Sequence, residues 1–177
     1  MSRIVIVQFK DKSYYASITN HSLSMGTKLN LLTGSQLTDV LVENPTYQHC
    51  LNIIYLAIIG FNKNLKLTYD EFLHQCHWKK EVLNEVYTQL ISGVVDIPEN
   101  KFAEELINKT SKVTSTNEKK IKPINLKFEC AEDRYVIYCL VYGIDHDIFW
   151  YSPIADVERI FNGIKAYKGW QSNPMTV

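Results

Sequence analysis

The sequence predicts a mainly helical α+β protein: a helical module with a small N-terminal β-hairpin, joined to a smaller C-terminal helical module. Three observations predict this fold. Residues 4–9 and 13–18 are short, apolar-leaning runs on either side of a polar turn, as in a hairpin. From residue 20 onward, apolar residues recur at helical spacing. A polar, lysine-rich stretch at 108–122 then divides the apolar pattern into two unequal parts.

The predicted hairpin has strands from Ile4 to Phe9 and from Ser13 to Ile18, joined by a turn at residues 10–12. β-branched residues favour the extended chain, and alternate residues of a strand face opposite sides of the sheet. One side of the first strand therefore carries Ile4, Ile6 and Gln8, and the other carries Val5, Val7 and Phe9. Because a two-stranded hairpin is only marginally stable alone, we expect it to pack on the helices that follow.

Helical segments are predicted for the rest of the larger module. They run from Asn20 to a stop at Gly34, from Ser35 to about Asn44, from Thr46 to Phe61, from Thr68 to about His77, and from Lys79 to Val94. The segment from Thr46 to Phe61 has almost no polar face, which indicates a helix surrounded by others. Thr68 and Glu71 have the spacing of a capping box, which predicts a helix start. The last segment has an apolar row of Val82, Val86, Leu90 and Val94, with Leu83, Tyr87 and Ile91 beside it.

A lysine-rich tether is predicted between the two modules. Residues 108–122 hold five lysines and one glutamate but no aromatic residue, so they cannot bury enough apolar surface to offset the entropy of ordering. A short helix after Pro98 precedes this stretch. The predicted organisation is a helical domain at 1–97, a short helix and basic tether at 98–123, and an aromatic-rich helical domain at 124–177.

Two helices are predicted in the smaller module. The first runs from Glu132 to Tyr142 and stops at Gly143, with its aliphatic residues inward: Val136, Ile137, Leu140 and Val141. The second begins at Pro153, a residue that suits the first turn of a helix. Its inward stripe is Ile154, Val157, Ile160, Phe161 and Ile164, and Glu158 and Arg159 are predicted to face outward.

Charge and composition narrow the possible functions. The formal net charge is zero, so nothing favours nucleic acid or an anionic membrane as the partner. The first residues lack the apolar run of a signal peptide, and the run from Leu51 to Phe61 is too short to span a membrane. The cysteines show no pairing pattern and are expected to be reduced: Cys50, Cys76, Cys130 and Cys139. We therefore expect a soluble, cytoplasmic protein.

Two clusters of polar residues could suggest chemical sites. His74, Cys76 and His77 could suggest a metal, but no zinc-binding framework surrounds them, and ordinary packing or exposure is favoured. The run from Asp145 to Asp147, with His146 between them, could suggest a small hydrolase. No nucleophile or second carboxylate lies at a recognisable spacing, so helix capping and solvation are favoured there. We expect neither enzymatic activity nor a metal or cofactor.

Three successive aromatic residues, Phe149, Trp150 and Tyr151, are the strongest candidates for a binding site. A unit of about 50 residues has too little interior to bury all three rings. Exposed aromatic surface often marks a partner site. The alternative is that the rings pack over the tether or over the larger module.

Several segments resemble the tail assembly chaperones of long-tailed bacteriophages. In the larger module these are the hairpin, "LLTGSQLTDVL", "LNIIYLAIIG", "LTYDEFLHQC" and "EVLNEVYTQLISGV". In the smaller module they are Asp133, Ile137 and Leu140, the run from Tyr142 to Asp145, the aromatic pair and "VERIFNGI". One departure is that Pro153 and "IADVERI" stand where the family commonly has a tryptophan-rich helix start.

The resemblance implies a non-enzymatic helical protein that keeps the tape measure protein soluble while tube subunits polymerise around it. The second domain of the family, often added by programmed frameshifting, recruits the tail tube protein, which adds Tyr142 to the candidate partner-binding residues. It further implies action in the host cytoplasm and absence from the mature virion. The sequence is also compatible with a homo-oligomer. A cytoplasmic regulatory or immunity-type module that binds one protein is the alternative.

Overall fold

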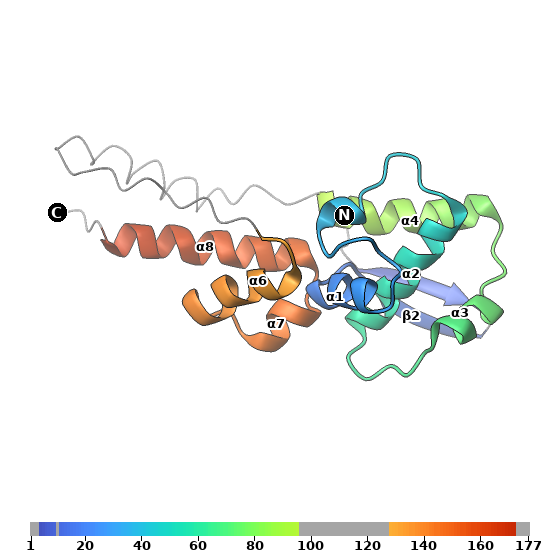
Figure 1. Cartoon of the computed structure of the whole chain (residues 1–177), viewed down its shortest axis with the longest axis horizontal. Coiled ribbons are helices and arrows are strands. Elements are labelled where there is room, and N and C mark those ends of the chain that lie inside the picture. Colours follow the sequence, from blue (N-terminus) through green and yellow to red (C-terminus); the bar gives the residue numbers. More distant parts are fainter. Residues whose placement is uncertain (1–3, 10, 96–127, 173–177) are drawn as a thin grey trace.

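The computed structural model describes residues 4–9, 11–95 and 128–172. These residues form a mainly helical fold with one antiparallel hairpin, which confirms the predicted fold class (Figure 1). In chain order the elements are β1 (Val5–Phe9), β2 (Lys12–Ala16), α1 (Asn20–Lys28), η1 (Leu37–Asp39), α2 (Tyr47–Phe61), α3 (Tyr69–Gln75), α4 (Lys80–Val95), α6 (Ala131–Tyr135), η2 (Val136–Val141), α7 (His146–Tyr151) and α8 (Ile154–Ser172).

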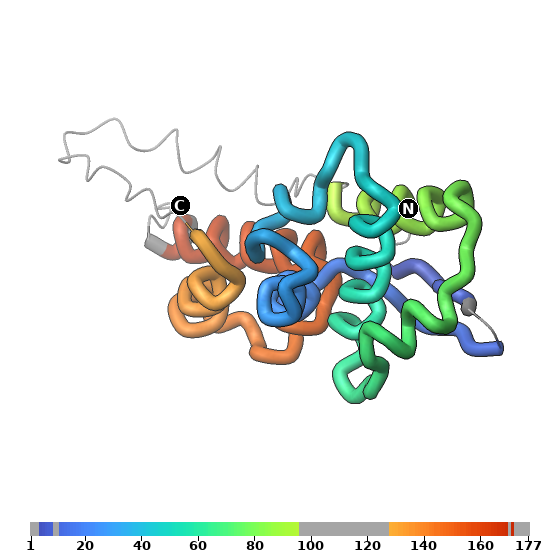
Figure 2. Tube along the Cα trace, turned by 45° about the vertical axis from the view of Figure 1, so that its right-hand side comes forward, coloured from blue at the N-terminus to red at the C-terminus, as the bar shows by residue number. Residues whose placement is uncertain are grey.

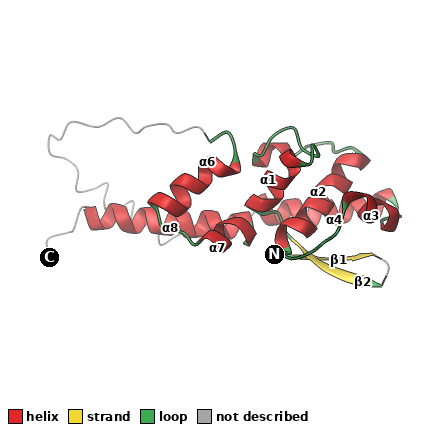
Figure 3. Ribbon diagram, turned by 60° about the horizontal axis from the view of Figure 1, so that its bottom comes forward, coloured by secondary structure: helices red, strands yellow, loops and turns green. Residues whose placement is uncertain are grey.

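The hairpin packs on the helices through one face, as its alternating pattern predicts. Its register pairs Val5 with Ala16 and Val7 with Tyr14, and Val5, Val7 and Ala16 are buried. Beyond the strand, the amide of Ser17 donates to the carbonyl of Ala57 in α2 at 3.2 Å. Figure 3 shows the two strands along the margin of the helices.

Helix α2 is the centre of the larger part of the fold. It begins where predicted, because the Thr46 side chain accepts a hydrogen bond from the amide of His49. Nearly every side of this helix is covered, and Ile53 and Ile54 have no exposed surface. The capping box at the start of α3 is also confirmed, with Thr68 and Glu71 each bonding to the backbone of the other.

Helix α1 ends earlier than predicted, and Asn30 rather than Gly34 stops it. Asn30 has a φ of 55°, in the left-handed region that asparagine tolerates better than most residues. The amide of Leu31 donates to the carbonyl of Gly26 at 2.8 Å, and the amide of Asn30 donates to that of Thr27 at 3.1 Å. This pair of bonds is a Schellman motif, which satisfies carbonyls of the last turn.

Helix α4 buries one side of the predicted apolar stripe and exposes the other. Leu83, Tyr87, Leu90 and Val94 are buried, whereas Val82 is 44% exposed. The Tyr87 hydroxyl donates to the carbonyl of Val40 at 2.9 Å, next to η1. The apolar stripe of α4 is therefore wider than the surface on which it packs.

In the stretch formed by α6 and η2, most of the predicted inward face is wrong. Ile137 is half-buried and packs on the C-terminal core, but Val136, Leu140 and Val141 are exposed, and Tyr138 is buried instead. η2 is a π-helix, in which the amide of Tyr142 donates to the carbonyl of Ile137 at 3.0 Å. The Tyr138 ring stacks on Phe161 of α8 with a centroid distance of 3.9 Å. Aromatic packing of Tyr138 therefore contributes to the orientation of this stretch, in which these aliphatic residues face outward.

Helix α8 departs from its prediction at Glu158, which lies inward rather than outward. The Tyr138 hydroxyl donates to the Glu158 carboxylate, at 2.8 Å and 2.9 Å to its two oxygens. Ile154 and Val157 are buried as predicted, whereas Ile160 is exposed. The helix also continues past residue 164, to Ser172.

The C-terminal helices lie against one end of the larger part of the fold, beside α1 (Figures 1 and 2). The amide of Ile154 donates to the carbonyl of Ile18 at 2.9 Å, which joins the two parts through the backbone. Separate folding of the two parts stays a prediction. The predicted short helix and tether at 98–123 lie outside the described residues.

Candidate partner-binding surfaces

The aromatic residues singled out from the sequence lie mainly on α7, and they have different surroundings. The Asp145 carboxylate caps this helix by accepting hydrogen bonds from the amides of Asp147 and Ile148. On this helix Phe149 faces inward, and its side chain is fully buried near the rings of Tyr135 and Tyr138. In this conformation Phe149 is core, and its ring is not accessible to a partner.

Trp150 and Tyr151 are half-buried against the larger part of the fold. The His21 ring of α1 lies 5.0 Å from the Tyr151 ring and 6.5 Å from the Trp150 ring, measured between centroids. Lys63 Nζ lies 5.1 Å from the Tyr151 centroid, and it also pairs with Asp147 at 2.7 Å. Packing over the larger module thus accounts for part of both rings, and a partner role for their remaining surface stays a prediction.

Tyr142 lies at the other end of this aromatic group, directly after η2. Its ring is half-buried, with the Phe161 ring 4.8 Å away in an edge-on arrangement. Lys168 Nζ lies 4.8 Å from the Tyr142 centroid and donates to the carbonyl of Val141 at 2.8 Å. A partner role for Tyr142 also stays a prediction.

A set of hydrogen bonds, which we name the polar joint, connects α1 to the C-terminal helices. Asn20 Nδ2 donates to the carbonyl of Phe149 at 3.0 Å, and Asn20 Oδ1 accepts from Arg134 Nη2 at 3.0 Å. The Ser24 hydroxyl donates to the Glu132 carboxylate at 2.8 Å. Asn20 and Ser24 are buried although they are polar. The sequence does not predict the polar joint, because a single asparagine or serine near the start of a helix does not indicate a hydrogen bond to a distant segment.

Burial shapes the electrostatics behind this joint. It raises the pKa of Glu158 and lowers the pKa of Arg134, because each charged form loses contact with water. Burial is also the main reason that the pKa of the Tyr138 hydroxyl is raised. The Arg134 Nε atom is buried without a hydrogen-bond partner. A buried charge with incomplete pairing costs free energy, so this region is held together by the bonds it does make.

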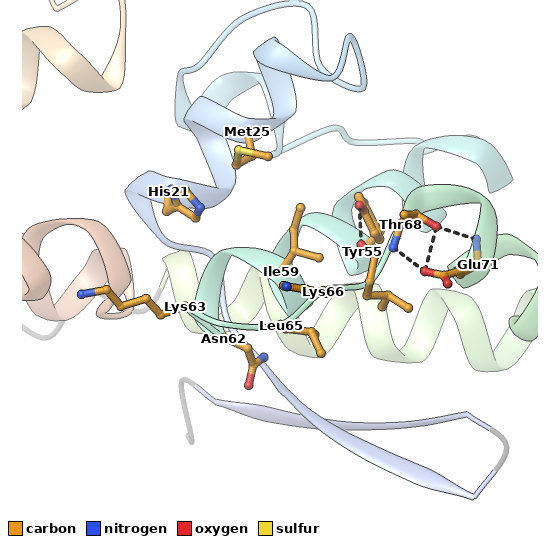
Figure 4. A pocket seen from close by; sticks show the side chains of 11 residues that line it. His21, Met25, Tyr55, Ile59, Asn62, Lys63, Leu65, Lys66, Thr68 and Glu71 are labelled. Carbon is orange, nitrogen blue, oxygen red and sulfur yellow. Dashed lines mark hydrogen bonds between the residues drawn. The ribbon is translucent and has the colours of Figure 1, made fainter.

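Two open pockets flank His21. One, of about 370 Å³, lies between α1, the end of α2 and the loop before α3, and is lined by residues such as Met25, Ile59 and Lys66 (Figure 4). The other, of about 350 Å³, includes Lys28, His146 and Trp150. Burial is the main reason that the pKa of His21 is lowered, which favours its neutral form. These are shallow surface features beside the polar joint rather than enclosed ligand cavities.

The most exposed apolar residues of the C-terminal helices form what we name the C-terminal apolar face: Val136, Leu140 and Val141. Their exposed fractions are 48%, 70% and 55%. The three residues share one side of η2, opposite the buried Tyr138. No apolar pattern in the sequence distinguishes this face from a core stripe, so sequence reasoning placed it inside.

The clusters weighed for chemistry have local structural roles where the structure describes them. Asp145 caps α7 and Asp147 pairs with Lys63. Burial raises the pKa of the Cys76 thiol to about 11. Within the described ranges, no group of three or more His, Cys, Asp or Glu side chains is placed to hold a metal ion.

Comparisons of the chain with protein-family models, curated proteins and solved structures gave no match. In the part of the chain that the structure describes, every helix is too short or too polar to cross a membrane.

Proposed function

We propose that this chain is a non-enzymatic tail assembly chaperone of a phage or prophage, which binds the tape measure protein and recruits tail tube subunits. The sequence resemblance supports the proposal. Its element order, a hairpin, short helices, a buried helix and an amphipathic helix, is also the order from β1 to α4. The larger part would bind the tape measure protein and the C-terminal helices the tube subunit.

The observation that carries the proposal is the C-terminal apolar face. A protein that recruits a partner subunit needs accessible surface for it, and exposed apolar patches usually mark sites of protein interaction. Here Leu140 is 70% exposed on a helix whose opposite side is well packed. Tyr142 follows η2 directly, and its half-buried ring lies against Phe161 and Lys168 of α8.

A regulatory or immunity-type module could use the same face for a single partner. The two functions differ in the number and kind of proteins bound. Two sites on one chain raise the effective concentration of one partner near the other, which suits an assembly chaperone. A regulator that binds a single protein needs only one binding site.

Co-expression with each proposed partner tests the function. The full chain is expected to keep the tape measure protein soluble and to co-purify with tube subunits. A double variant, Leu140→Asp with Val141→Asp, is expected to lose the tube subunits and retain the tape measure protein. Both side chains are exposed, so the fold should tolerate the charges, and circular dichroism would check it.

Val82→Asp is the matched control, because Val82 is an exposed aliphatic residue of α4, away from the C-terminal apolar face. It is expected to retain both partners. If the double variant recruits tube subunits as well as the wild type does, the C-terminal apolar face is not the tube site. If the wild type binds neither protein, the chaperone function is wrong.

A further inference from the structure

The larger of the two pockets beside His21 is lined by apolar side chains from three segments (Figure 4). We name it the α1–α2 groove, after Met25 of α1 and Ile59 of α2, which line it together with Leu65 of the loop before α3. Each of these three side chains packs on the core but is only half-buried. Apolar surface that a fold leaves accessible in a hollow is suited to the side chains of another protein.

Hydrogen bonds hold the loop that forms one side of this groove. The amide of Leu65 donates to the carbonyl of Asn62 at 3.0 Å, and the Tyr55 hydroxyl donates to the carbonyl of Leu67 at 2.9 Å. The capping box at Thr68 then fixes the end of the loop. A loop that is already ordered loses little conformational entropy when a partner binds, so this groove is preorganised for binding.

The volume and openness of the groove define the kind of occupant. A cavity of about 150 Å³ is large enough to hold one benzene molecule. The groove has about 370 Å³, which leaves room for roughly two large apolar side chains. Sites for small molecules enclose most of the surface of their ligand, whereas this hollow is open to solvent. A protein segment lying across it is therefore the better fit.

The unpaired charge at the groove is positive. Lys63 is paired with Asp147 at 2.7 Å. Glu71 is the one acidic residue in the lining, and its carboxylate already accepts from the amide and the hydroxyl of Thr68, at 2.9 Å and 2.8 Å. Lys66 is exposed, and its ammonium group has no hydrogen-bond or ion-pair partner among the described residues. A carboxylate on the bound segment is the group that matches this charge.

We propose that the α1–α2 groove is the site at which the larger part holds the tape measure protein, through a segment with two apolar side chains beside a carboxylate. This assignment rests on the proposed chaperone function. The apolar side chains occupy the hollow beside Met25 and Ile59, and the carboxylate pairs with Lys66. Methionine suits this position, because its flexible and polarizable side chain adapts to apolar groups of different shape. The C-terminal apolar face takes no part in this contact and stays available to the tube subunit.

Peptide binding to the full chain tests the chemistry of the bound segment. Overlapping fluorescein-labelled peptides that cover the tape measure protein serve as probes, and fluorescence anisotropy measures their dissociation constants. Peptides with two apolar residues beside an aspartate or glutamate are expected to bind. Replacing that acidic residue by lysine should weaken binding by more than about fivefold. Peptides that bind equally well after this replacement would overturn the proposal.

Variants of the groove locate the site. Lys66→Glu reverses the unpaired charge, and Met25→Gln makes the lining polar while keeping an equally good helix former. Each is expected to weaken peptide binding by more than about fivefold, and circular dichroism checks that each remains folded. Lys80→Glu makes the same charge change on α4, outside the groove, and should bind as the wild type does. Equal binding by both groove variants and the wild type would show that the peptides bind elsewhere.

Co-expression separates the groove assignment from the chaperone function. Lys66→Glu is expected to lose the tape measure protein and retain the tube subunits, the reverse of the double variant at Leu140 and Val141. If Lys66→Glu keeps the tape measure protein soluble as well as the wild type does, the groove is not its site, although the chaperone function stands. If the wild type binds neither protein, both proposals are wrong. If light scattering shows that the wild type dimerises and Lys66→Glu does not, a second copy occupies the groove, and the assignment to the tape measure protein is wrong.

Discussion

The substitution Asn20→Ala isolates the polar joint. Asn20 is buried at the start of α1, and its amide group donates to the carbonyl of Phe149 and accepts from Arg134. Alanine is a better helix former than asparagine, so the change should not weaken α1 itself. Any loss of stability therefore measures the connection to the C-terminal helices.

The expected loss follows from the two hydrogen bonds. A neutral bond contributes about 1 kcal/mol and a bond to a charged group about 1.5–3 kcal/mol, so Asn20→Ala should lower the free energy of unfolding by roughly 2–4 kcal/mol. Urea denaturation followed by circular dichroism measures this value. Asn162→Ala is the control, since Asn162 is an exposed residue of α8, and it should cost less than about 0.5 kcal/mol.

A double-mutant cycle with Arg134→Ala separates the joint from general packing. If Asn20 and Arg134 form one unit, the effects should fail to add, with a coupling energy of about 0.5–3 kcal/mol. Additive effects, or a loss below about 0.5 kcal/mol for Asn20→Ala, would show that the joint does not hold the two parts together.

The remaining predictions test the core, a helix crossing and a buried carboxylate. Ile54→Ala should destabilise the fold by roughly 2–5 kcal/mol in denaturation experiments, because Ile54 is fully buried in α2. Gly60→Ala should also destabilise the fold, by about 1–3 kcal/mol, because an added Cβ would lie 2.8 Å from the Ser22 backbone. Gly169→Ala is the control: its added Cβ meets open space, so this change should stabilise the protein slightly. Burial raises the pKa of Glu158 above its unfolded value, so ionisation of this carboxyl favours unfolding. As the pH rises from the unfolded pKa to the folded pKa, the wild type should therefore lose stability relative to Glu158→Gln. A stability difference that does not depend on pH would contradict this.

Local chemistry explains which elements could be predicted from the sequence. The start of α3 depends on Thr68 and Glu71, which are three residues apart and satisfy each other's backbone bonds. The helix from Thr46 to Phe61 is apolar on nearly every side, so any compact fold must surround it. Both predictions need no knowledge of a distant partner, and both are confirmed.

The features that could not be predicted depend on contacts between distant segments. Glu158 has the helical position of a surface residue, and its burial is made tolerable by two distant groups, the Tyr138 hydroxyl and the charge of Arg134. Asn20 bonds to residues more than 110 positions away. The end of α1 is a different case: asparagine can stop a helix, but Gly34 is the more usual signal and lies close behind Asn30.

The same contacts explain why the C-terminal apolar face stays exposed. Turning the stretch from α6 to η2 so that Val136, Leu140 and Val141 faced inward would bury three aliphatic side chains that are already partly covered. Full burial contributes about 1.5–3 kcal/mol for such a side chain, so the remaining gain is roughly half of that for each. The rotation would also separate Tyr138 from Glu158 and Arg134 from Asn20.

A hydrogen bond to a charged group contributes about 1.5–3 kcal/mol, and two such bonds would be broken. The stacked rings of Tyr138 and Phe161 would be lost as well. The summed cost exceeds the apolar gain, so the buried polar bonds hold the aliphatic side of η2 toward the surface. Replacing Glu158 and Arg134 together by leucine should therefore release this constraint, and we expect weaker tube recruitment because the C-terminal apolar face can then turn inward.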